Sequence, residues 1–189
     1  MKSLIKSTLV IAFVSVAIIA CKDDDDDSVK NGKTTVNPNE EELITTVEAI
    51  FSDTNGVALD TFKFEDPDGL GGDAPTIDTI RLNSNSKYDL SIRFLDESDS
   101  TDVENITAEI QAEDDEHLIC FEEKTSNALN ISKTDSDGTY PIGLSSRWEV
   151  GAAANGSIVI SLKHQPGVKD GSCSPGETDI EVEFPLVLK

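Results

Sequence analysis

Basic residues are scarce in this sequence of 189 residues: 15 Lys and Arg stand against 37 Asp and Glu, and the formal net charge is −22. Proteins that bind nucleic acid neutralise phosphates with clustered Lys and Arg, so this composition excludes nucleic acid as a partner. It also disfavours electrostatic docking to anionic lipid. The strong negative field favours cations or basic partners instead.

Motifs of the common enzyme classes are missing as well. The sequence contains no G-x-S-x-G elbow, no Walker A loop, no dinucleotide-binding fingerprint and no C-x-x-C pair. With 37 acidic residues, a neighbouring pair of carboxylates is expected by chance, so such a pair does not indicate a glycosidase. We therefore expect a protein that is not an enzyme.

The longest apolar run lies at the N-terminus. Lys2 and Lys6 precede residues 9–20 (LVIAFVSVAIIA), and Cys21 follows directly. A short basic segment followed by about 7–15 apolar residues is typical of a secretory signal, and the run is shorter than the roughly 20 residues of a membrane span. The residues before Cys21 resemble the lipobox of bacterial lipoproteins. This resemblance implies that residues 1–20 are a signal peptide and that Cys21 carries a stable lipid anchor.

The composition of residues 21–39 predicts a tether that begins with an export signal. Lys22 precedes five aspartates, beginning with Asp23 and Asp24, and residues 28–39 are polar, which is typical of an extended, solvated spacer. The order Cys21-Lys22-Asp23-Asp24 resembles the surface-export signal of lipoproteins from Bacteroidetes. That resemblance implies an outer-membrane lipoprotein at the cell surface; the alternative is an anchor that faces the periplasm.

Residues 40–189 have the length of one folded domain and are dominated by period-two alternation. The alternation predicts strands at residues 88–94, 142–150, 158–162 and 180–188, and weaker strands at 43–51, 58–64, 76–82, 117–122 and 128–133. About nine short strands separated by Gly, Asn and Asp turns predict a mostly β fold. We expect a single antiparallel β-sandwich of the Ig-like or Greek-key type. Pro185 predicts an edge position or a bulge in the last strand, because proline cannot donate to the ladder.

One segment has a helical period instead. Val103, Ile106 and Ile110 lie three and seven residues apart, and Thr101 with Glu104 fits a capping box. The pattern predicts one short helix over residues 102–112.

Cys120 and Cys173 are the cysteines that remain once Cys21 is assigned to the lipid. Export permits disulfides, so we expect these two to form one. The alternative is a pair of free thiols.

Two histidines form a candidate metal site. His117 and His164 each share the apolar phase of a predicted strand and lie at its end, and Glu177 and Asp179 follow the second of them after a loop. Two His with carboxylates would suit Zn²⁺ or Cu²⁺. The alternative is two polar residues at the edge of the core.

A second candidate cation site lies in the loop at residues 65–73. Asp66, Asp68 and Asp73 alternate with glycines there, and carboxylates on a flexible backbone suit Ca²⁺. The spacing does not match an EF-hand. The alternative is an ordinary Gly/Asp hairpin loop.

Four stretches of the domain carry a resemblance to a known family: residues 41–46 (EELITT), 66–69 with 73–75 (DPDG and DAP), 104–107 with 115–117 (ENIT and DEH) and 176–182 (GETDIEV). They resemble short lipoproteins of Flavobacteria and relatives that are often labelled type 1 periplasmic binding fold superfamily. The resemblance implies an envelope compartment and solute binding. The two-lobed α/β fold of that label is not expected, because this sequence lacks βαβ alternation.

Together these patterns predict a lipid-anchored outer-membrane protein at the cell surface. Its domain would bind a ligand or partner without catalysis, as an accessory to an outer-membrane transporter. Two alternatives stay open: metal capture through His117 and His164, and a structural or adhesion module with Ca²⁺ in the loop of Asp66.

Overall fold

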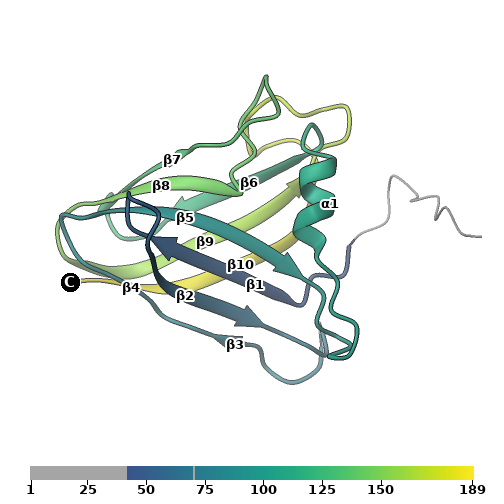
Figure 1. The fold of residues 1–189 in the computed structure, drawn as a ribbon, viewed down its shortest axis with the longest axis horizontal. Coiled ribbons are helices and arrows are strands. Elements are labelled where there is room, and N and C mark those ends of the chain that lie inside the picture. Colours follow the sequence, from purple (N-terminus) through teal and green to yellow (C-terminus); the bar gives the residue numbers. More distant parts are fainter. Residues whose placement is uncertain (1–41, 70) are drawn as a thin grey trace, which may run out of the picture. The chain divides into compact units, whose positions relative to one another are not determined.

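The computed structural model describes residues 42–69 and 71–189, which form two facing β-sheets and one helix (Figure 1). The first sheet has six strands, in the order β3 (Thr76–Ile77), β2 (Ala58–Glu65), β1 (Thr46–Ser52), β5 (Lys87–Leu95), β8 (Ser145–Val150) and β7 (Leu129–Lys133). The second has four, in the order β4 (Ile80–Leu82), β10 (Glu177–Leu188), β9 (Ala154–His164) and β6 (His117–Glu123). The predicted mostly β sandwich with one short helix is confirmed.

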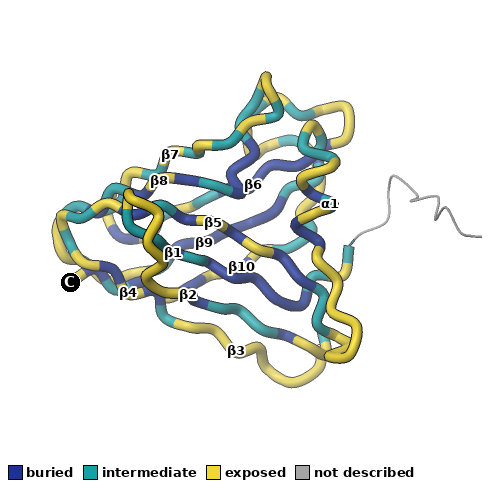
Figure 2. Tube along the Cα trace, in the orientation of Figure 1, coloured by how far each residue is buried: buried dark blue, intermediate teal, exposed yellow. Residues whose placement is uncertain are grey.

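Period-two alternation produces the apolar layer between the sheets. Along β5, Tyr88, Leu90, Ile92 and Phe94 are buried, whereas Ser91 between them is exposed. β8 and the second half of β10 alternate in the same way, whereas β1 and β9 contain continuous runs of buried residues (Figure 2). Burial of one face by each sheet is the main source of stability in such a sandwich.

The single tryptophan lies at the centre of this layer. Trp148 is fully buried, and its ring meets Phe51 edge to face with centroids 5.2 Å apart and Phe121 at 5.9 Å. Its indole N–H donates to Ser146 Oγ at 3.0 Å, so the buried polar atom is satisfied within its own strand. Aromatic pairs in this geometry add about 0.5–1.5 kcal/mol each to the stability gained from burial.

The helix begins later than predicted. Helix α1 spans Ile106–Ala112 rather than residues 102–112, and its N-cap, Asn105, makes no side-chain capping bond. Thr101 instead donates its backbone N–H and its hydroxyl to Asp99 Oδ1, at 2.9 and 2.7 Å. This local turn competes with helical bonds, so the predicted capping box does not form. Among the described residues, no helix has the length and apolar character needed to cross a membrane.

The predicted strand at residues 76–82 is in fact two strands in different sheets. β3 pairs with β2 at the edge of the first sheet, and β4 pairs in parallel with β10 from Ile80↔Leu186 to Leu82↔Leu188. The chain therefore crosses from one sheet to the other between Ile77 and Ile80. Every other pair of neighbouring strands among the described residues is antiparallel.

β10 has a neighbouring strand on each side, but at Pro185 only the side that faces β9 is paired. β9 pairs with β10 on one side throughout, but β4 covers only Leu186–Leu188 on the other. Proline is therefore tolerated directly before this short pairing. The β-bulge of β10 lies elsewhere, between Thr178 and Ile180.

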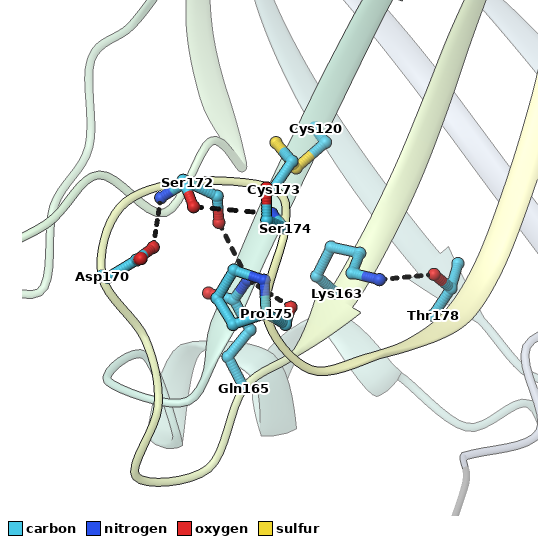
Figure 3. Close-up of a disulfide and its surroundings, with 9 residues drawn as sticks. All are labelled: Cys120, Lys163, Gln165, Asp170, Ser172, Cys173, Ser174, Pro175 and Thr178. Carbon is cyan, nitrogen blue, oxygen red and sulfur yellow. Dashed lines mark hydrogen bonds between the residues drawn. A yellow bond between two sulfur atoms is a disulfide. The ribbon is translucent and has the colours of Figure 1, made fainter.

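The disulfide forms as predicted. It joins Cys120 of β6 to Cys173 in the loop between β9 and β10, with Cα atoms 6.1 Å apart (Figure 3). The same loop is held from inside by Gln165, whose amide donates to the carbonyls of Ser172 and Pro175, both at 2.9 Å. The loop that leads into β10 is thus fixed at several points.

Loss of this disulfide should lower stability without changing the fold. Its two cysteines are 53 residues apart, and closing a loop of this length contributes about 4 kcal/mol. Chemical unfolding with and without reductant measures the effect, with the double variant Cys120→Ser, Cys173→Ser as the control that must not respond to reductant. Unfolding of the wild type that is unchanged by reductant would contradict the prediction.

Candidate ligand pocket

The predicted lipidation and export residues cannot be placed. The described residues do not include Cys21, Lys22, Asp23 and Asp24. The lipid anchor and the export signal therefore stay predictions. The remaining candidate residues all lie within the described part of the chain.

The two histidines do come together. His117 of β6 and His164 of β9 are register partners, and their rings stack with centroids 4.9 Å apart and an angle of 13° between planes. Nδ1 of His117 lies 3.0 Å from the Glu113 carbonyl, and Nε2 of His164 lies 3.5 Å from the Glu116 carboxylate. The ends of β6 and β9 that carry these residues therefore lie side by side in the second sheet.

The metal site predicted around them is not assembled. Glu177 is the register partner of His164 on β10 but is exposed, and Asp179 lies at the β-bulge between Thr178 and Ile180. Within residues 42–69 and 71–189, no group of three or more His, Cys, Asp or Glu is arranged to hold a metal ion. The stacked pair fits the alternative, in which two polar residues close the edge of the core.

The predicted calcium loop is not assembled either. Asp68 Oδ2 accepts the backbone N–H of Asp73 at 2.7 Å, which closes the loop on itself, and both residues are exposed. Asp66 is different, because it is buried at the end of β2. Its backbone N–H donates to the Thr45 carbonyl at 2.8 Å, and its carbonyl accepts from the N–H of Gly69 at 3.1 Å. The three carboxylates therefore lie in different environments: Asp66 is buried, whereas Asp68 and Asp73 are exposed.

Asp66 lines a pocket of about 450 Å³ that sequence analysis missed. We call it the edge pocket; its lining consists of residues 42–44, Phe64, Asp66, Gly69 and residues 178–181. These segments precede β1, end β2 and open β10, so the pocket lies between the two sheets at the end of the sandwich that carries α1 (Figure 1). Three segments far apart in sequence make one site.

The shortness of β4 explains why a pocket exists here. β4 pairs with β10 only at Leu186–Leu188, whereas β3 extends the first sheet beside Phe64 and Glu65. At the α1 end the first sheet therefore reaches beyond the second. Among the described residues, no strand covers the start of β10 on that side.

The walls of the edge pocket combine apolar and acidic side chains. Ile44, Phe64 and Ile180 are partly buried and pack against the core. Glu42 and Asp66 each have a buried carboxylate oxygen, Oε2 and Oδ1, with no hydrogen-bond partner among the described residues. A buried carboxylate oxygen without a donor costs free energy, so these two atoms are suited to a ligand that brings one.

The pKa of Glu42 reflects this environment. Burial is the largest cause, and together with the carboxylates of Glu109, Asp179, Glu113 and Glu104 it raises the pKa from 4.5 to about 7. Glu42 is therefore partly protonated at neutral pH, and a cation in the pocket would favour its ionised form. Groups with such shifts are common at functional sites.

Comparison of the chain with protein-family models, with curated proteins and with solved structures gave no match.

The raised pKa of Glu42 predicts a pH-dependent stability. Between pH 4.5 and about 7 the folded protein binds more protons than the unfolded chain, so the free energy of unfolding falls as pH rises through this window. Glu42→Gln should therefore be more stable than the wild type at pH 8, by about 1 kcal/mol after allowance for the exposed part of the side chain. The difference should vanish at pH 4, as measured by chemical unfolding at both values.

Glu122→Gln is the matched control, because Glu122 is an exposed glutamate on β6. It should leave the pH dependence unchanged. A Glu42→Gln protein that is no more stable than the wild type at pH 8 would contradict the assigned environment.

Proposed function

We propose that this protein is a lipid-anchored lipoprotein of the outer membrane, displayed at the cell surface, and that its sandwich is a non-catalytic binding module. The edge pocket is the proposed binding site. The observation that carries this proposal is the pair of buried carboxylate oxygens, in Glu42 and Asp66, that the described protein leaves without donors.

The size and composition of the edge pocket support a small-molecule ligand. Its volume of about 450 Å³ lies within the range of roughly 300–1,000 Å³ that is usual for such sites. Apolar walls with a few polar groups are the usual composition too. The sequence carries none of the common catalytic motifs, which supports binding rather than chemistry.

The N-terminal sequence supports the location. Cys21 follows an apolar run of signal-peptide length, and Lys22, Asp23 and Asp24 resemble a surface-export signal. A binding domain that is tethered to the membrane raises the concentration of its ligand close to the membrane. This arrangement suits an accessory of an outer-membrane transporter, which is the partner we propose.

Replacement of Cys21 tests the anchor. Cys21→Ser should abolish incorporation of radiolabelled palmitate and move the protein from the membrane fraction to the soluble fraction, because no acyl chains can be attached. In the wild type, protease added to intact cells should degrade the domain. Protection from protease until the cells are lysed would place the anchor on the periplasmic face instead.

Native mass spectrometry tests the binding site without a guess at the ligand. The wild type, isolated from its own membranes, should carry a bound small molecule that Asp66→Asn loses at least in large part. The control is Asp73→Asn, which removes the same charge from the same loop but lies outside the pocket lining. Equal occupancy in both variants would contradict the assignment of the edge pocket.

A further inference from the structure

We propose that the ligand of the edge pocket is an organic cation with a primary ammonium group on an aliphatic body, such as an aliphatic amine or diamine. The inference rests on the proposed function, because it names the ligand class of the same pocket.

The described lining of the edge pocket leaves two buried carboxylate oxygens without a hydrogen-bond donor. Asp66 is nine-tenths buried, yet its Oδ1 has no hydrogen-bond partner among the described residues. Glu42 is only half-buried, but its Oε2 atom is also buried without a partner among the described residues, and Glu42 lines the same pocket. An ammonium group offers three N–H donors, no acceptor and a positive charge, so it is the kind of group that either carboxylate can bind.

The electrostatic field around the edge pocket is negative. The carboxylates of Asp179 in the lining and of Glu104, Glu109 and Glu113 around α1 all act on Glu42 in the same direction. Lys163 reaches the lining, but its ammonium donates to the hydroxyl of Thr178 at 2.7 Å. It is not a hydrogen-bond partner of either carboxylate oxygen. An anionic ligand would be repelled here, and a cation attracted.

The lining of the edge pocket suits an organic cation better than a metal ion. Ca²⁺ requires six to eight oxygen ligands, and no suitable group of three or more His, Cys, Asp or Glu exists within residues 42–69 and 71–189. A bare ion would also leave the apolar walls at Ile44, Phe64 and Ile180 in contact with water. Methylene groups of an amine would cover these walls while its ammonium meets the carboxylates.

Binding of simple probes to the full-length protein tests the ligand class. The probes are 1-aminopentane and 1,5-diaminopentane. Pentan-1-ol has the same body without the charge, and ammonium chloride has the charge without the body. Ligand-observed NMR and calorimetric titration should show binding of the amines, with a dissociation constant of about 1 mM for so small a fragment. Affinity for the alcohol and for the ammonium ion should be at least tenfold weaker.

Two pocket variants locate the binding. Asp66→Asn and Glu42→Gln should each weaken amine binding roughly tenfold or more, because each removes a charge-assisted hydrogen bond. Asp73→Asn should leave the affinity within about twofold of the wild type, because exposed charges outside the pocket are screened. Two separate variants guard against the case in which the buried Asp66 position does not tolerate substitution.

Each outcome decides the proposal. No amine binding, equal binding of pentan-1-ol, or equal affinities in Asp66→Asn and Asp73→Asn would overturn it. Stabilisation by Ca²⁺ or Zn²⁺ that depends on Asp66 would replace the amine by a metal ion and leave the pocket as the binding site. The proposed function has its own tests, in the anchor and in the ligand carried from the membrane, so the two proposals fail separately.

Discussion

The unequal width of the two sheets is the constraint on which the candidate site depends. Six strands and four strands share one apolar layer, and the fourth strand of the narrower sheet, β4, has only three residues. At the α1 end, β2 and β3 therefore extend past β10 without a strand opposite them in the described part of the chain. The gap between the sheets is lined by side chains of both, and it becomes the edge pocket. The same short pairing makes room for Pro185.

Both walls of this gap are held by bonds that do not involve a ligand. The loop before β10 is fixed by the Cys120–Cys173 disulfide and by Gln165. Gly176 ends it with a positive φ of 77°, and a Cβ there would lie 2.1 Å from the His164 carbonyl oxygen. On the opposite wall, Asp66 is bonded through its backbone to Thr45. A site built this way loses little conformational entropy when it binds, which favours affinity for a small ligand.

Local patterns predicted much of the fold but not the pocket. Alternation located most strands, because burial of one face imposes a period of two. The shared phase and strand-end positions of His117 and His164 are visible in the sequence, but the stacking of their rings was not predicted. The split of residues 76–82 between sheets left no such pattern, because β3 and β4 are too short to show one. Each pocket wall pairs an acid with an apolar neighbour, as in Asp179 and Ile180, but only the topology reveals that three such segments meet.

Buried acids elsewhere in the fold are paired with basic residues, unlike Glu42 Oε2 and Asp66 Oδ1 in the edge pocket. Glu48 is buried on β1, and its carboxylate is paired with Lys63 at 2.8 Å and with Arg93 at 2.6 Å. Asp137 is paired with Lys169 at 2.7 Å, and hydrogen bonding lowers its pKa to about 2. The pKa of Glu42 is shifted the opposite way, to about 7. A chain with this many acids thus supplies cations where a buried carboxylate serves stability alone. At Glu42 and Asp66 the described residues supply none, and the cation that we propose there is the ligand.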